Sequence, residues 1–105
     1  HRFGIHAGDI ETSMMLALSP NSVNMAEAQN FASTSQERAK HYAVLGNGKS
    51  AKLGWHMQDY NPQGAAGDAS AATAAKGEAL VRSAGEQLAL LLKELVALPL
   101  STVRV

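Results

Sequence analysis

The feature that most constrains the fold is a long amphipathic segment close to the C-terminal end of the chain. Between residues 71 and 97, apolar side chains recur every three or four positions, which is the spacing of one face of an α-helix. The stripe consists of Val81, Ala84, Leu88, Leu91 and Leu95, and Leu90, Leu92 and Val96 widen it. Burial stabilises each large apolar side chain by about 1.5–3 kcal/mol, so this helix needs a second layer of structure to cover it.

Two further helices are predicted ahead of this segment. The first spans residues 10–18, where apolar residues four apart share a face and Asp9 is placed to cap the free amides of the first turn. The second lies within residues 34–45, where Thr34 and Glu37 have the spacing of a capping box. A short helix near residues 25–29, followed by an extended piece, is the remaining element expected before residue 46.

Strand signals are weak by comparison. The candidates are residues 2–6 and residues 51–57, the latter after a turn at Asn47 and Gly48. Gly77 and Gly85 lie inside the predicted last helix, where each costs about 1 kcal/mol relative to alanine, and close packing against a neighbour would explain them. Long helices with so little sheet indicate an α/β protein of which this chain is a helix-rich part.

Composition excludes several classes of function. The chain has 105 residues, which suits one domain, with nine basic and nine acidic residues and no cysteine. The balanced charge gives no attraction to nucleic acid or to an anionic membrane, and the lack of cysteine excludes disulfides and thiolate zinc sites. Apolar runs are too short to span a bilayer. A cytoplasmic location is therefore expected.

The segment "HAGDIET", residues 6–12, carries the strongest hint of chemistry. On a continuous helix His6 and Glu11 would lie about 140° apart and could not serve one site. With His6 on a loop and Glu11 in the first helical turn, both side chains can face one cavity, and the small residues Ala7 and Gly8 leave room for this. Spacing alone favours the simpler interpretation, in which Asp9 caps the helix, Glu11 complements its dipole and His6 is an ordinary loop histidine.

Other motifs favour structural roles. "GNGKS", residues 46–50, ends like a phosphate-binding loop, but Ala43 stands where the pattern requires glycine, so a turn is predicted. "WHMQD", residues 55–59, would place Trp55 in the core with a polar strand end beside it, although a cofactor contact stays open as the alternative.

Two segments resemble the creatininase (creatinine amidohydrolase) family. "FGIHAGDIETSMMLALSP" is similar to the family's His-[Ala/Gly]-Gly-x-x-Glu-Thr-Ser motif, and "GWHMQDYNPQGAAGDASAATAAKG" is similar to its tryptophan-containing loop and the start of its last helix. The order and spacing agree over essentially the whole chain. The resemblance implies a three-layer α/β/α domain, of which residues 1–105 would be the C-terminal segment.

The resemblance also implies an activity. Family members are amidohydrolases that cleave small cyclic or linear amides with a pair of divalent metals, zinc or manganese, and commonly form hexamers. By the motif, Glu11 corresponds to a metal ligand, and His6 to a histidine that contacts substrate and assists proton transfer. Metals that polarise an amide carbonyl, and a histidine that protonates the leaving nitrogen, suit this chemistry.

Departures from the family pattern refine this expectation. Arg2 and Phe3 stand where creatinine-hydrolysing members carry a Trp-Asp pair, which points away from creatinine as the substrate. The family's other metal ligands belong to an N-terminal half without counterpart here, so the chain would supply only part of the site. Alone it is expected to bind metal poorly and to hydrolyse nothing. The competing hypothesis is a non-enzymatic, α-rich interaction or oligomerisation module derived from the family.

Overall fold

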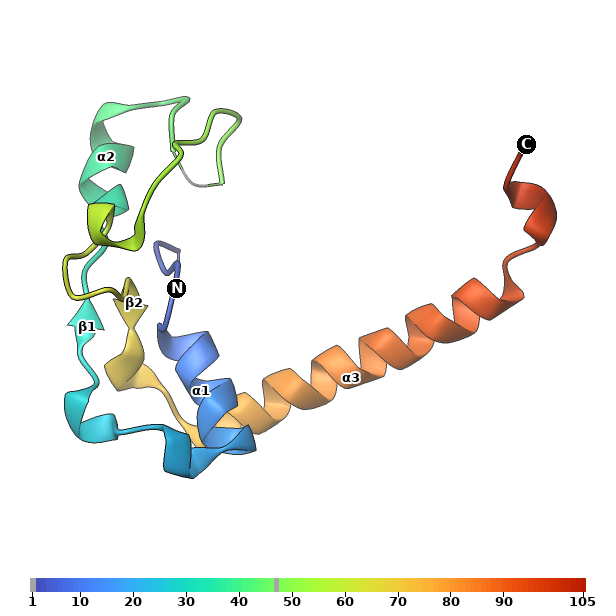
Figure 1. Ribbon diagram of the computed structural model, residues 1–105, viewed down its shortest axis with the longest axis horizontal. Helices are drawn as coiled ribbons and strands as arrows, with labels where there is room; N and C mark the ends of the chain where they lie inside the picture. The colour runs from blue at the N-terminus through green and yellow to red at the C-terminus, as the bar shows by residue number, and fades with distance from the viewer. Residues whose placement is uncertain (1, 47) are drawn as a thin grey trace.

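The computed structural model describes residues 2–46 and 48–105 (Figure 1). Within them, the α-helices are α1 (Asp9–Leu18), α2 (Ser35–His41) and α3 (Ala74–Ala97). The strands β1 (Asn30–Phe31) and β2 (Gly67–Asp68) pair antiparallel, with Asn30 opposite Asp68 and Phe31 opposite Gly67. Short 3-10 turns occupy Pro20–Ser22, Met25–Glu27, Met57–Asp59, Ala69–Ala71 and Leu100–Thr102.

Helix α1 packs across the first turns of α3 at a contact made by small residues. Gly77 of α3 is buried, and a Cβ added to it would overlap the Ser13 carbonyl oxygen and lie 3.0 Å from the Ala17 Cβ. The Ser13 hydroxyl, which is fully buried, accepts a hydrogen bond of 3.1 Å from the Thr73 amide. The glycine therefore allows two helix backbones to approach more closely than any larger residue would permit.

The buried core is small and is formed by residues that precede and follow β2 in the sequence. Its apolar members are Tyr60, Ala65, Ala66, Ala69 and Ala72, so it consists of alanine methyl groups and one tyrosine ring. The rings of Tyr60 and Trp55 pack edge to face, with ring centroids 4.8 Å apart. A core of this size covers the loops around β2 and the start of α1, and leaves most of α3 outside it.

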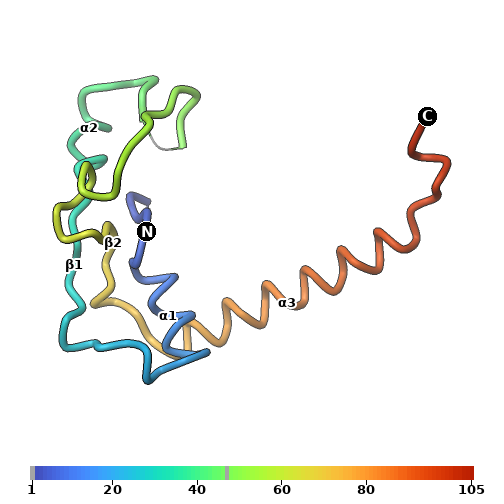
Figure 2. Tube along the Cα trace, viewed as in Figure 1, coloured from blue at the N-terminus to red at the C-terminus, as the bar shows by residue number. Residues whose placement is uncertain are grey.

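The molecule is extended, because α3 projects away from the other elements (Figure 2). Its radius of gyration is 18.1 Å, compared with about 13 Å for a compact chain of this length. Its accessible surface is 7733 Å², compared with about 5,600 Å² for a folded monomer of this mass. The predicted stripe on α3 is helical but uncovered within the described residues: Leu88, Leu91 and Leu95 are 55%, 56% and 60% exposed.

Several expectations from the sequence were wrong in detail. Asp9 does not cap α1; Gly8 holds the cap position, without a side-chain hydrogen bond, and Asp9 is the first helical residue. No regular strand forms at residues 51–57, where an isolated bridge joins Ala51 to Leu45 and a 3-10 turn follows. Trp55 is 45% exposed rather than in the core.

The predicted capping box of α2 is also absent. The Thr34 hydroxyl donates to the Asp59 carbonyl at 2.8 Å, and Glu37 pairs with Lys40 and His41 on the solvent-facing side of the helix. Both side chains therefore serve partners other than the helix amides. The turn expected at Asn47 and Gly48 falls partly outside the described residues, because Asn47 is not among them.

The three predicted α-helices form, two of them with shorter bounds. The helix expected at residues 71–97 begins at Ala74, and the one expected within residues 34–45 ends at His41. The short helix expected near residues 25–29 is a 3-10 turn followed by the extended β1, and the strand expected at residues 2–6 is only an isolated bridge at His6. The fold is a mixture of helices with a small antiparallel sheet, and the close packing expected at a helix glycine is confirmed at Gly77 but not at Gly85. Among the described residues, no helix is both long enough and apolar enough to cross a membrane.

Candidate active site

The candidate site is built where the N-terminal loop turns into α1. His6 lies in an isolated antiparallel bridge with Ala66, and Ala7 and Gly8 then turn the chain into the helix. Gly8 sits directly against β2, since a Cβ added to Gly67 would lie 2.7 Å from the Gly8 Cα. This contact between two glycine backbones fixes the loop against the sheet, and leaves no space for a larger residue at Gly67.

His6 and Glu11 meet across this turn, as the loop-and-helix arrangement predicted. The His6 Nδ1 lies 3.6 Å from the Glu11 Oε2, and the two side chains are 53% and 52% exposed. Both residues line one cavity together with Gly4, Ile5, Gly8, Ile10 and Met14. A second cavity on the other side of Glu11 also contains Glu27 and Asn24. An imidazole and a carboxylate at an open surface can exchange protons with a bound molecule.

Asp9 faces away from His6 and joins α1 to α3. Its Oδ1 accepts hydrogen bonds from the Lys76 Nζ at 2.6 Å and from the Ser13 hydroxyl at 3.1 Å. The Lys76 ammonium holds the pKa of the Asp9 carboxyl below its ordinary value, partial burial opposes this, and the Ser13 hydroxyl lowers the pKa further. Lys76 also donates to the Ala71 carbonyl at 2.5 Å. Asp9 is thus a link between helices.

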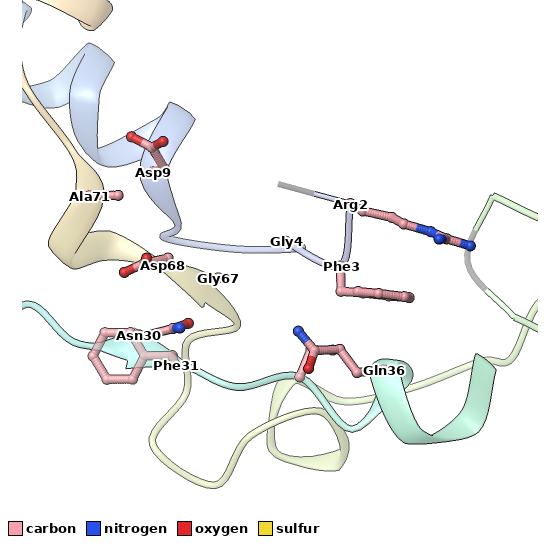
Figure 3. Close-up of a pocket in the computed structure, with 11 residues that line it drawn as sticks. Arg2, Phe3, Gly4, Asp9, Asn30, Phe31, Gln36, Gly67, Asp68 and Ala71 are labelled. Carbon is pink, nitrogen blue, oxygen red and sulfur yellow. The ribbon is translucent and has the colours of Figure 1, made fainter. Parts of the chain in front are cut away.

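A separate cavity of about 330 Å³ opens beside Asp9 (Figure 3). Figure 3 shows Asp9 from α1, Asp68 from β2 and Asn30 from β1 around it, with Gln36 from α2 farther along. The two carboxylates at this cavity have partners of their own: Asp9 binds Lys76, and Asp68 accepts from the Ser70 hydroxyl at 2.5 Å. Neither His6 nor Glu11 lines this cavity.

The described residues do not form a metal centre by themselves. Residues 2–46 and 48–105 contain no group of three or more His, Asp or Glu side chains close enough to hold an ion. His6 and Glu11 offer nitrogen and oxygen donors of the type that zinc and manganese accept. A stable site needs four or more ligands, and these two residues supply only two of them. Any metal at this position therefore requires ligands from another segment.

The contacts of the tryptophan-containing loop hold the loop itself in place. His56 begins a 3-10 turn in which its amide donates to the Asp59 carboxylate at 2.7 Å. Trp55 rests on Tyr60, and Asn61 holds the Ala32 carbonyl through its side-chain amide at 3.0 Å. These contacts tie the loop to the residues before α2.

Sequence reasoning missed two features of the site. One is the pairing of Lys76 with Asp9, which joins residues far apart in the chain and has no spacing signal. The other is the conformation of Ala7, whose φ of +55° is left-handed and uncommon for alanine. The sequence does not point to Ala7, because a left-handed conformation would be expected at the following glycine, Gly8.

Comparisons with known proteins place this geometry in a family. The sequence model described as creatininase, creatinine amidohydrolase, matches residues 1–92. A crystal structure of a protein from Bacteroides fragilis NCTC 9343, assigned as a creatinine amidohydrolase, is similar with a TM-score of 0.73 and 34% identity. The match covers 93% of this chain and 37% of that one, so the chain spans little more than a third of its relative. A comparison with curated proteins found no match.

The family model spans both motifs, the one at His6 and the one before α3. The structural match covers 93% of the chain. The family model covers well over half of the chain, which is sufficient to identify the family. The chain belongs to the creatininase family.

Proposed function

We propose that the chain supplies one wall of the active site of a metal-dependent amidohydrolase that cleaves a small cyclic or linear amide. The observation that carries the proposal is the meeting of the His6 ring and the Glu11 carboxylate at one open cavity, 3.6 Å apart, in the motif that the family shares. Family membership over residues 1–92 favours this function over a non-enzymatic module.

The residues have separate roles in this proposal. His6 contacts the substrate and passes a proton to the leaving nitrogen, because its exposed ring can reach a molecule in the cavity. Glu11 offers one carboxylate oxygen to a divalent ion, zinc or manganese, whose other ligands come from outside the described residues. Such an ion, one of a pair, would polarise the amide carbonyl. The described residues cannot hold this ion alone.

The proposed partners follow from the exposed surface. We propose that the segment packs against the remainder of a creatininase-type domain, and the uncovered leucines of α3 and the small core support this. We propose that the completed protein is a homo-oligomer, a hexamer by analogy with the family. Sedimentation of the completed protein would measure this directly, and a monomeric mass would overturn it.

The test of the activity is complementation. The part of the Bacteroides fragilis protein that this chain does not cover would be produced separately and combined with the 105-residue chain, with zinc or manganese added. Hydrolysis of a panel of small amides, with creatinine included, is expected from the combination and from neither part alone. His6→Ala in the combination is expected to abolish turnover while both parts still bind each other.

Two results would contradict the proposal. One is metal analysis that finds two tightly bound ions on the isolated chain, because the described residues offer too few ligands for them. The other is a stable combination of the two parts, loaded with metal, that hydrolyses no amide while the intact Bacteroides fragilis protein does.

A further inference from the structure

The turn between His6 and α1 holds a residue in a costly conformation. Ala7 has a φ of +55°, and it is the one non-glycine residue with positive φ among the described residues. The left-handed region is unfavourable for any residue with a Cβ, and such residues persist only where surrounding contacts over-determine them. Strained residues of this kind cluster at functional sites.

Side chains from the first turns of α1 hold Ala7 at both of its backbone polar groups. The Glu11 Oε2 accepts a hydrogen bond of 2.7 Å from the Ala7 amide, and the Thr12 hydroxyl donates to the Ala7 carbonyl at 3.2 Å. The first is a short, charge-assisted bond of the stronger type. The consecutive Glu-Thr pair therefore clamps the strained residue from both sides.

The residue before the clamp is His6, and its backbone is fixed on the other side. The His6 amide donates to the Ala66 carbonyl at 3.2 Å, and the Ala66 amide donates to the His6 carbonyl at 2.9 Å. With Ala66 on one side and the clamped Ala7 on the other, the His6 Cα has little freedom. The ring is then placed with its Nδ1 toward the same Glu11 oxygen that holds Ala7, at 3.6 Å.

We propose that Glu11 is the positioning residue of His6, acting through the clamp on Ala7 and through its charge beside Nδ1. A carboxylate next to Nδ1 favours the tautomer that carries its proton there, which leaves the lone pair of Nε2 facing the substrate. Nε2 then takes a proton from the attacking water as general base and passes that same proton to the leaving nitrogen. The separation of 3.6 Å is longer than a hydrogen bond, and contacts of this kind shorten when a substrate closes the site. The effect on catalysis rests on the proposed function, whereas the expected tautomer of His6 does not depend on that function.

One carboxylate oxygen suffices for this task. The clamp and the approach to His6 both use Oε2, so Oε1 stays available for the metal ligation proposed above. Glu11 would then orient the proton-transfer residue and the ion from a single side chain, as hydrogen-bonded carboxylate ligands commonly do.

The alternative explanation is helix capping alone. Glu11 is the third residue of α1, where a carboxylate ordinarily reaches back to a free amide at the helix start. Capping accounts for the bond to Ala7 but makes no demand on the His6 ring. The state of that ring therefore separates the two explanations.

The experiment is nitrogen-detected NMR of the imidazole rings in the 105-residue chain, at about pH 8, where an imidazole is normally neutral. Two-bond and three-bond couplings report which ring nitrogen carries the proton, and His41 and His56 serve as references within the same molecule. A His6→Asn variant assigns the signal. We expect His6 mainly as the Nδ1–H tautomer, with the opposite preference at His56, which has no carboxylate ion pair.

Substitutions then test the cause. Glu11→Gln should return His6 to the Nε2–H tautomer, since an amide nitrogen replaces the charged oxygen beside Nδ1, and leave the signals of His41 and His56 unchanged. Thr12→Val should loosen the clamp and broaden the His6 signal, and Thr12→Ser should preserve it. In case Glu11→Gln unfolds the turn, the pair Ala7→Gly and Glu11→Gln removes the strain and still lacks the charge.

The outcomes are distinct. His6 in the Nε2–H form in the unsubstituted chain, or an equal tautomer ratio with and without the Glu11 charge, would overturn the proposal. In the complemented protein, Thr12→Val, which leaves the Glu11 carboxylate in place, is expected to lower kcat with KM nearly unchanged, and Thr12→Ser is expected to restore kcat. If complementation yields no hydrolysis, the proposed function fails while the tautomer result stands by itself.

Discussion

At the scale of single residues, the structure assigns opposite roles to two neighbouring acids of α1. Glu11 turns back toward His6, and Asp9 turns toward α3 and Lys76. The sequence alone could not separate them, because both acids lie in the first helical turn, where either can complement the helix dipole. Asp9 differs from Glu11 because Lys76, which lies far along the chain, donates a hydrogen bond to its carboxylate. This charge-assisted bond takes the place of a bond from the free helix amides.

The Asp9 pair gives a prediction with a pH dependence. Because Lys76 lowers the Asp9 pKa below its ordinary value of 3.8, the ionised form is the one stabilised on folding. That stability is fully present above the ordinary pKa and is lost as pH falls through the lowered pKa of the folded state. Lys76→Met should therefore destabilise the chain by about 0.5–1 kcal/mol at neutral pH, and by progressively less below about pH 4.

Urea unfolding at a series of pH values, followed by circular dichroism, measures this. Lys40→Met on α2 is the matched control, because its Glu37 partner is exposed to solvent and the change should be smaller at every pH. A constant difference between Lys76→Met and the parent chain from neutral to strongly acidic pH would show that the Asp9 charge is not involved.

The contact between the two loop glycines gives a second prediction at this scale. Gly67→Ala should destabilise the chain by about 1–3 kcal/mol, because its Cβ would lie 2.7 Å from the Gly8 backbone and its φ is +147°. Gly54→Ala, which meets nothing within 4 Å, should change stability by less than about 0.5 kcal/mol. Thermal unfolding of the two variants compares them, and equal melting temperatures would contradict the close approach.

At the scale of elements, the helices were predictable and the irregular segments were not. The periodicity of α1 and α3 is local, so the sequence determines it directly. The alternation of Trp55 and Met57 suggested a strand, but a strand needs a partner, and within the described residues that segment makes one isolated bridge instead. His6 and Glu11 were identifiable through the shared motif, whereas spacing alone favoured capping. The dihedral angles of Ala7 had no signal, since they result from contacts.

Helix α3 offers an internal comparison of two glycines. Gly77→Ala should destabilise the chain by more than about 2 kcal/mol, because the new methyl group would overlap the Ser13 backbone of α1. Gly85→Ala, in the same helix but in open space, should stabilise it by up to about 1 kcal/mol through helix propensity.

Denaturant midpoints of the two variants measure the difference. The comparison is matched in chemistry and in secondary structure, so the sign of the change reports the helix crossing and not the helix itself. Stabilisation by both substitutions would mean that α1 and α3 do not meet at Gly77 in solution.

At the scale of the whole molecule, the dominant feature is apolar surface without a cover. Beyond Val81, every residue of α3 is exposed within the described structure, including leucines that would each contribute about 1.5–3 kcal/mol if buried. This exposed stripe accounts for why the composition resembles that of a globular domain while the shape does not.

Hydrogen exchange tests how this surface is used. In the isolated chain, amides of α3 from Leu88 to Ala97 should exchange rapidly, because every residue of that part of the helix is exposed in the described structure. On addition of the uncovered part of the Bacteroides fragilis protein, the same amides should become protected by at least a hundredfold, and those of α2 should change little. Protection of this stretch in the isolated chain at low concentration would contradict the structure.

The clamp on Ala7 has a consequence for the order in which the chain folds. The Glu11 and Thr12 bonds connect residues four and five positions apart, so they can form together with the first turn of α1, on the microsecond scale of helix formation. The bridge from His6 to Ala66 closes a far longer loop and is slower to form. The bend that aims His6 is therefore determined locally by residues 6–12, and the segment around Ala66 pairs with a bend that has already formed.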